Sequence, residues 1–225
     1  LQVPVLNAAH AIAVSRDKLQ ALQLLAARNI DVPITVCGRN PVDIQTSISL
    51  VNGCPTIVKL QQGTQGIGTM IADTEQSAHA MLETFWAMGQ DIVLQEFVKE
   101  SKGRDLRIIV VGGRVIAAMR RVAKRGEFRA NLHRGGQATQ IKVSKSMERV
   151  AIDAADAMGL EVAGVDMLEG KKGPRVLEIN SSPGLEGIER TTGINVASAI
   201  IEHAENFVRK ERRSAKRALA RATPK

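Results

Sequence analysis

The sequence predicts an α+β protein made of two lobes that join near residues 97–104. In the first part of the chain helix and strand patterns alternate, whereas from Asp105 onward the strands come in hairpins. The 225 residues are 44% hydrophobic, which is enough apolar material to bury one large core or two small ones. A junction between lobes is a common place for a ligand cleft, so we expect a binding site there.

The first lobe is predicted to contain helices joined to short strands. Ser15 is a suitable cap for a helix that places Leu19, Leu22 and Leu25 on one face. In chain order the elements are a helix from Ser15 to about Asn29, the strand "PITVC", a helix opened by Asn40-Pro41 and closed by Gly53, the strand "PTIVKL", the loop "GTQGIG", the return strand "TMIA", a helix from Thr74 to about Met88, and the strand "DIVLQEF".

The second lobe is predicted to begin with a tight hairpin. Gly112-Gly113 separates "LRIIVV" from "RVIAAM", and a pair of glycines between two apolar runs is a strong turn signal. The elements that follow are a loop over 124–138, a helix from Ser144 to Met158, a second hairpin over 165–184, and a last helix from about Thr191 to Val208.

Charge and composition exclude several classes of protein. The net charge of +8 comes almost entirely from 208–225, which holds eight basic residues against Glu211. The rest of the chain is nearly neutral, which argues against a DNA-binding domain; a solvated, frayed helix end explains the tail better than a nucleic-acid contact, although that contact stays open. No apolar run approaches the roughly 18 to 20 residues that cross a bilayer.

The start of the chain and its two cysteines indicate whether it is a fragment and in which redox environment it works. The start "LQVPVLNAAHAIAV" has no initiating Met and no signal pattern, so we expect a fragment of a longer protein. Cys37 and Cys54 provide neither a disulfide framework nor a metal-binding spacing. They fit a reducing cytoplasm.

The second hairpin, "VDMLEGKKGPRVLEINSSPG", carries three oxygen-bearing side chains inside apolar strands. If its turn centres on 171–173, the residue numbers of each facing pair add up to about 344. This places Asp166 opposite Glu178. Glu178 and Asn180 share a face, because side chains alternate along a strand. Asp, Glu and Asn suit Mg²⁺ or Mn²⁺ better than zinc. The alternative is a solvated polar edge strand with Lys171, Lys172 and Arg175 as ion-pair partners.

A second group of residues favours a phosphate-binding site. Lys59 lies inside the apolar strand "PTIVKL", where an unpaired ammonium is costly. The loop that follows contains Gly63, Gly66 and Gly68, whose backbone N–H groups can approach an anion. Each signal is weak alone, but a strand lysine, a glycine-rich loop and a carboxylate face together indicate a nucleoside triphosphate site.

At these residues the sequence resembles the ATP-grasp ligases, and within them the RimK-like branch. The resemblance covers nearly the whole chain; its anchors are "VKLQQGTQGIG", "QEFVKESKGRDLR", "EFRANLHRGG", "VAGVDML" and "LEINSSPGLEGIERTTGIN". It implies an ATP-grasp fold with two α+β lobes enclosing the nucleotide, and a preceding small α/β domain that is largely absent. The implied segments are a remnant of that domain at 1–14, an N-terminal lobe with a glycine-rich lid at 15–97, a C-terminal lobe with the metal site at 98–207, and a basic tail at 208–225.

The resemblance also implies a role for each matched residue. Lys59 and Lys18 match phosphate-binding lysines, and the glycine-rich loop covers the phosphates. Arg121 sits where relatives carry arginines that face the phosphates or an acyl phosphate. The remaining matches are Glu96 and Phe97 at the adenine, with Tyr common at the latter position in relatives, Asp105 at the ribose hydroxyls, Arg129, Ala130 and Asn131 in an ATP-contacting loop, and Asp166, Glu178 and Asn180 as ligands of two Mg²⁺ or Mn²⁺ ions.

The implied activity is ATP-dependent addition of L-glutamate to the C-terminal tail of a small-subunit ribosomal protein, with poly-α-glutamate as a further product. The implied partners are ATP, glutamate and that protein tail, in a cytoplasmic homo-oligomer, commonly a tetramer, with no membrane. Two alternatives stay open. One is a related ligase acting on a small-molecule or peptide acceptor, and the other is a regulatory nucleotide- or RNA-binding module that uses the basic tail.

Overall fold

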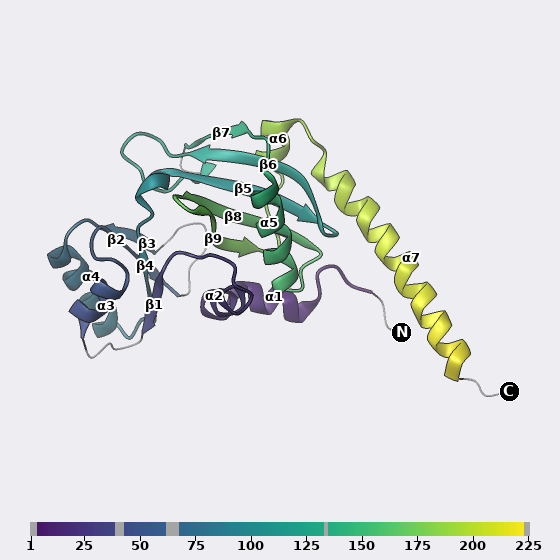
Figure 1. The fold of residues 1–225 in the computed structure, drawn as a ribbon, viewed down its shortest axis with the longest axis horizontal. Helices are drawn as coiled ribbons and strands as arrows, with labels where there is room; N and C mark the ends of the chain where they lie inside the picture. The colour runs from purple at the N-terminus through teal and green to yellow at the C-terminus, as the bar shows by residue number, and fades with distance from the viewer. Residues whose placement is uncertain (1–3, 39–42, 62–67, 133–134, 223–225) are drawn as a thin grey trace.

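The protein folds into two α+β lobes, as the sequence predicts (Figure 1). The computed structural model describes residues 4–38, 43–61, 68–132 and 135–222. A four-stranded sheet of order β1-β4-β2-β3 forms the smaller lobe, and a five-stranded sheet of order β7-β6-β5-β8-β9 forms the larger one. All the strand pairs in both sheets are antiparallel.

The smaller lobe packs two helices against its sheet. Ile48, Val58 and Leu82 are fully buried in its core. Its elements are β1 (Thr35–Gly38), α3 (Ile44–Leu50), β2 (Thr56–Leu60), β3 (Thr69–Ala72), α4 (Glu75–Ala87) and β4 (Ile92–Glu96).

Two helix ends in this lobe follow the predicted chemistry. Thr74 caps α4 by accepting a hydrogen bond from the Ser77 N–H. Gly53 has a φ of +74° and donates to the Ile48 carbonyl, so it closes α3. The described part of α3 begins after Asp43, whose side chain caps it, and the predicted Asn40-Pro41 start lies outside the described residues.

The larger lobe forms around a sheet of long strands. The turn at Gly112-Gly113 is confirmed, because both glycines have a positive φ, as a tight hairpin turn requires. Its elements are β5 (Arg104–Val111), β6 (Arg114–Val122), β7 (Gln137–Gln140), α5 (Lys145–Ala157), β8 (Val162–Gly170) and β9 (Gly173–Asn180). The strand β7 was predicted as loop; it is a short, mostly exposed edge strand whose sequence has no apolar alternation.

The first helical region belongs to the larger lobe. It forms two helices, α1 (Ala9–Arg16) and α2 (Lys18–Ala27), where one helix capped by Ser15 was predicted. That prediction was wrong because Asp17 is the cap, accepting from the Gln20 N–H, while Ser15 lies within α1. Leu25 is buried in the same core as β5 and β8. The two hydrophobic cores therefore divide the chain near residue 31, whereas the sequence placed the first lobe at 15–97.

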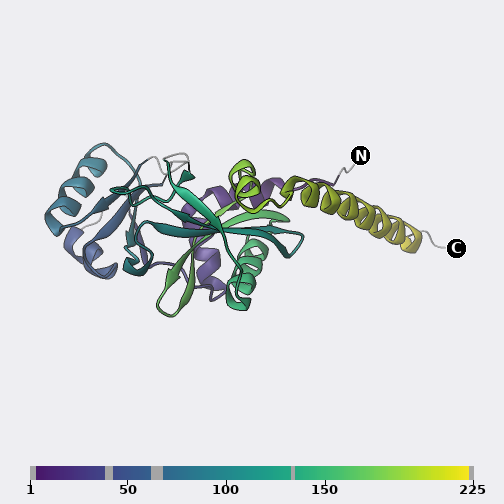
Figure 2. The ribbon, with the colours of Figure 1, turned by 90° about the horizontal axis from the view of Figure 1, so that it is seen from above.

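The C-terminal region also differs from its prediction. A short helix, α6 (Glu186–Thr192), ends at Gly193 with a φ of +68°, and a separate helix, α7 (Val196–Ala222), follows. The predicted helix start at Thr191 was therefore wrong. Helix α7 begins against the larger sheet and then projects away from both lobes, as two perpendicular views show (Figures 1 and 2). None of the helices described for this chain is long and apolar enough to cross a membrane.

Candidate functional site

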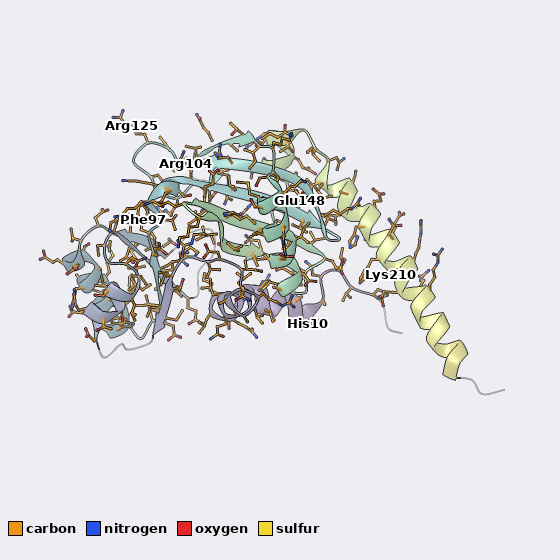
Figure 3. All side chains as sticks on the ribbon, viewed as in Figure 1. His10, Phe97, Arg104, Arg125, Glu148 and Lys210 are labelled. Atoms are coloured by element: carbon orange, nitrogen blue, oxygen red, sulfur yellow. The ribbon has the colours of Figure 1, made fainter. Side chains whose placement is uncertain are left out.

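Two adjoining cavities lie where the lobes meet. Their volumes are about 340 Å³ and about 140 Å³, and Lys59, Thr69 and Glu178 line both. The larger cavity extends to α2 and to the residues that follow β9. The smaller one extends to the connection between the lobes, where Phe97 lies (Figure 3). The two cavities form one cleft that both lobes line.

The hairpin of β8 and β9 places Asp166 directly opposite Glu178, as the sequence predicts. This pairing arises partly for a different reason from the one expected. The turn consists of Lys171 and Lys172, so the residue numbers of the facing pairs nearest to it, such as Gly170 with Gly173, add up to 343. A bulge at Leu177 adds one residue to β9 and restores the predicted pairing for Asp166.

Asp166 is held by two arginines. Arg107 donates through Nε and Nη2 to Oδ1 and Oδ2 of Asp166, at 2.7 Å and 2.6 Å. Arg121 Nη2 lies 3.0 Å from the same Oδ2. Burial alone would raise the pKa of Asp166, but the two guanidinium groups outweigh it and hold that pKa below its ordinary value.

Arg121 also binds Asp105. Its Nε and Nη2 donate to the two carboxylate oxygens at 2.6 Å and 2.8 Å, and both side chains are almost fully buried. Burial raises the pKa of Asp105 despite this pairing. The four side chains Asp105, Arg107, Arg121 and Asp166 form one ion-pair network, and three of them, Asp105, Arg121 and Asp166, line the smaller cavity.

The alternative partners predicted for the hairpin carboxylates bind elsewhere. Lys171 lies 3.3 Å from Glu100, and Arg175 binds Glu96. Strand β9 is an edge strand, as the polar-edge interpretation required. Nevertheless Asp166 is buried, so the hairpin is not simply a solvated polar face.

Glu178 is exposed to the cleft, beside the lysines. Lost hydration and the facing Asp166 carboxylate raise the pKa of Glu178, while Lys59 and Lys18 oppose that shift. Asn180 follows on the same strand, and its Nδ2 donates to the Gly164 carbonyl at 3.4 Å, which leaves the Oδ1 side of the amide as an acceptor.

These three residues fit a hard divalent cation. Two facing carboxylates and one amide oxygen are ligands that Mg²⁺ or Mn²⁺ accepts. Both oxygens of Asp166 are bound by arginines in this structure, so Asp166 has to exchange one of these contacts to bind an ion, whereas Glu178 and Asn180 do not. The described residues contain no group of three or more His, Cys, Asp and Glu arranged for a metal. A zinc-type centre is therefore a poor fit for this part of the chain, and the Asn180 amide is needed to complete the set.

Lys59 reaches the cleft from β2. Its Nζ donates to Gln95 Oε1 at 2.7 Å, and Gln95 Nε2 in turn donates to Thr35. Burial lowers the pKa of Lys59 to about 8; Lys18 adds to that shift and Glu178 opposes it. Lys18, at the start of α2, donates to the Gln61 carbonyl at 2.8 Å, so both lysines lie at the same end of β2.

If the cleft binds a phosphate group beside Lys59, the lowered pKa of this lysine makes that binding depend on pH. Below about pH 8 the ammonium is charged and attracts phosphate, whereas above that value it is neutral, so we expect the Kd of ADP to rise about tenfold between about pH 7 and about pH 9. Titrations of ADP at several pH values measure this. Lys59→Arg stays charged and should remove the dependence.

Unfolding of the protein does not explain a loss of ADP affinity at high pH. Because the folded-state pKa of Lys59 lies below its ordinary value of 10.5, the unfolded chain binds more protons between those two values. This residue therefore contributes rising stability as pH increases through that window. A Kd that stays constant in the wild type over this range contradicts a phosphate role for Lys59.

The glycine-rich loop is only partly described. Gly63 and Gly66 lie outside the described residues. Gly68 has a φ of +76°, and its carbonyl accepts from the Leu60 N–H at 3.0 Å, which closes the loop onto β2. This position favours glycine, because a side chain at positive φ is strained and a Cβ would also crowd Leu60.

Arg129 connects the loop before β7 to the smaller lobe. Its guanidinium donates to Glu127, at 2.8 Å from Nη2, and to the Thr69 carbonyl of β3 at 3.4 Å. Hydrogen bonds from Arg129 lower the pKa of Glu127 to about 2. Arg129, Ala130 and Asn131 all line the smaller cavity of the cleft. The predicted "FRAN" segment therefore lies in the cleft.

Sequence reasoning missed Arg107 as a partner of Asp166, and it missed Glu127. Arg107 is two residues from Asp105 on β5, so both side chains point to the same face, and this alternation was a usable signal. No comparable pattern marked Glu127, which orients Arg129 from an irregular loop.

The carboxylate of Glu96 is engaged by two neighbouring groups. Its Oε2 accepts from Arg175 Nη2 at 2.9 Å and from the Ile34 N–H at 3.1 Å. Glu96 and Phe97 both line the smaller cavity.

The structure is similar to solved ATP-grasp proteins. The chain superposes on the ATP-grasp ligase PsnB, solved with a phosphomimetic variant of a minimal precursor, Mg and ADP, with a TM-score of 0.72 at 23% identity over 91% of this chain and 63% of that one. A D-alanine–D-alanine ligase from Bacillus anthracis gives a TM-score of 0.71 at 19% identity, covering 90% of this chain and 71% of that one. The class that this fold defines is the ATP-grasp proteins.

The sequence comparisons narrow that class. The model of the RimK-like ATP-grasp domain matches residues 15–204, and the chain belongs to this family. A probable alpha-L-glutamate ligase from Pseudomonas putida is 54% identical over 200 residues, which cover 89% of this chain. The chain spans 66% of the length of that relative.

Proposed function

We propose that the cleft binds ATP with one or two Mg²⁺ or Mn²⁺ ions. The observation that carries the proposal is the convergence of Lys59, Glu178 and Arg129 from three separate elements on adjoining cavities between the lobes. The backbone of Glu96 and Phe97 faces the adenine, Asp105 is assigned to the ribose, and Lys59 and Lys18 with the glycine-rich loop hold the phosphates. Arg129, Ala130 and Asn131 line the smaller cavity of the cleft.

Asp166, Glu178 and Asn180 are the proposed metal ligands. Bound there, the ions would neutralise charge on the phosphate oxygens. Arg121 supports this site by binding both Asp105 and Asp166, and it lines the smaller cavity with them. Because its guanidinium is already paired with two carboxylates, we propose this supporting role in place of a direct phosphate contact.

The reaction proposed for the whole protein is ATP-dependent formation of an amide by an α-L-glutamate ligase. A carboxylate oxygen of the acceptor attacks the γ-phosphorus of ATP and ADP leaves, giving an acyl phosphate. The amine of glutamate then attacks the acyl carbon, phosphate leaves, and the amine loses a proton. Lys59, Lys18 and Arg129 stabilise the negative charge that accumulates between acceptor and nucleotide.

The name of the Pseudomonas putida relative supports glutamate as the amino acid. As acceptor we propose the C-terminal tail of a small-subunit ribosomal protein, with repeated addition giving poly-α-glutamate. The free thiols of Cys37 and Cys54 agree with a cytoplasmic location. A tetramer and an RNA contact through the basic helix α7 complete this proposal; Arg209, Lys210 and Arg213 on that helix are exposed, and Lys210 lies far from the cleft (Figure 3).

The decisive experiment supplies Mg-ATP, glutamate and several acceptors. The protein is incubated separately with a small-subunit ribosomal protein, a peptide of its tail, glutamate alone, and small carboxylic acids, and products are read by mass spectrometry. We expect successive additions of one glutamyl unit to the protein tail. Addition only to a small acceptor supports the related-ligase alternative, and ATP binding without any product supports a regulatory module.

A further inference from the structure

The chain passes between the lobes at two places within the described residues. Residues 31–34 lead from α2 in the larger lobe to β1 in the smaller one, and residues 97–103 lead back from β4 to β5. We call the second passage, 97–103, the hinge segment. The smaller cavity of the cleft is lined by its first residues, Phe97 and Val98, together with Glu96.

Arg175 binds both passages from the larger lobe. It lies on β9, and its Nη2 donates to the Val32 carbonyl and to Glu96 Oε2, each at 2.9 Å. Its Nε lies 3.5 Å from the Asp31 carboxylate, and its side chain is only 15% exposed. One guanidinium therefore fixes residues before β1 and at the end of β4 to the same point of β9.

Neighbouring hydrogen bonds also hold this junction. The Val176 N–H donates to the Asp31 carbonyl at 2.8 Å, so the first passage is also held by the backbone of β9. Glu96 and Ile34 exchange two hydrogen bonds, one from each residue's N–H. At the other end of the hinge segment, Ser101 accepts from the Glu169 N–H at 2.7 Å. The hairpin of β8 and β9 thus anchors the hinge segment at both ends.

Arg175 does not line either cavity of the cleft, whereas its partner Glu96 lines the smaller one, so an effect of Arg175 on a ligand is indirect. The ion pair is only partly solvated, with Glu96 18% exposed, and Glu96 and Phe97 both line the smaller cavity. The Arg175–Glu96 pair is largely enclosed, and each partner makes a further hydrogen bond to the main chain. These contacts fix its geometry more closely than that of an ion pair on the surface.

From this geometry we propose that Arg175 is a positioning residue that holds the backbone of Glu96 and Phe97 in register for the nucleobase, and so sets affinity for the base without contributing to phosphate binding. The inference rests on the proposed nucleotide site. Arginine suits this task better than lysine, because a planar guanidinium can hold the Val32 carbonyl and the Glu96 carboxylate together.

The test compares a ligand that has the base with one that lacks it. Mg-ADP and Mg-tripolyphosphate are titrated calorimetrically into the wild type, Arg175→Met and Arg175→Lys, with Arg149→Met as the matched control, since Arg149 is 83% exposed on α5. For Arg175→Met we expect the Kd of ADP to rise about tenfold, a typical effect of losing one charged hydrogen bond, and that of tripolyphosphate to change less than about twofold. The Kd of ADP for Arg175→Lys should lie between those of the wild type and Arg175→Met. For the control, the Kd values of both ligands should match the wild type.

Other outcomes overturn the inference in distinguishable ways. If both ligands weaken equally, Arg175 has a general structural role, and if neither changes, it has no role in binding. If the wild type binds neither ligand, the nucleotide site itself is wrong, and the inference fails with it. Should Arg175→Met not fold, Arg175→Lys and Glu96→Gln retain the bulk of the pair, and the same comparison between the two ligands decides.

Discussion

Replacing Arg121 by Met is expected to destabilise the protein by about 3 to 5 kcal/mol, the largest stability effect that we predict. The guanidinium of Arg121 is the common partner of Asp105 and Asp166, and all three side chains are less than 10% exposed. Its loss leaves Asp105 without its bidentate partner, and it leaves Asp166 with Arg107 alone. Denaturation in urea followed by circular dichroism measures the change in the free energy of unfolding.

The neighbouring Arg120 provides a matched control. It lies on the same strand and pairs with Glu169, but its side chain is 39% exposed. We expect Arg120→Met to cost no more than about 1 kcal/mol, because water replaces most of what an exposed pair contributes. Equal losses for the two variants would show that the buried network does not stabilise the fold in the way described.

Replacing Glu178 by Gln is expected to lower ATP-dependent ligation at least about 100-fold, since a lost metal ligand removes several kcal/mol of electrostatic stabilisation. The fold should be unaffected or slightly more stable. Burial and then repulsion by Asp166 raise the pKa of Glu178, and a neutral amide lowers both costs. Product formation by mass spectrometry and the midpoint of thermal unfolding give the two measurements.

Glu169→Gln is the control for this variant. Glu169 lies on the facing strand β8, pairs with Arg120, and lines neither cavity of the cleft. Ligation by this variant should match the wild type. A Glu178→Gln protein that keeps most of its activity would rule out the proposed ligand set.

Much of the fold was predictable because its signals are local. Gly112-Gly113 marks a turn, Thr74 and Ser144 cap helices, and apolar runs mark the strands, all through interactions within a few residues. The boundary errors have equally local causes. Ser15 and Asp17 both suit a cap, and only the geometry of the chain favours Asp17.

The pairing of Asp166 with Glu178 was predictable for the same reason, since a hairpin register follows from its turn and from strand alternation. No local pattern in the sequence marks the bulge at Leu177. The prediction succeeded because the assumed turn centre shifts the register by one residue and the bulge shifts it by one residue in the compensating direction.

The sequence by itself determined the α+β class, the position of the hairpins, the oxygen-bearing face of β9 and the family of the chain. Only the tertiary structure decided which charges pair beyond a single hairpin. Asp105 and Arg121 face each other across the hairpin of β5 and β6, but Arg107 and Asp166 lie 59 residues apart, and Glu96 and Arg175 lie 79 apart. For charges on strands that are distant in sequence, the meeting of two side chains depends on sheet order and lobe packing. Local spacing does not encode it, and for this reason the link from Arg107 to Asp166 and the contact at the hinge segment became visible only in the folded protein.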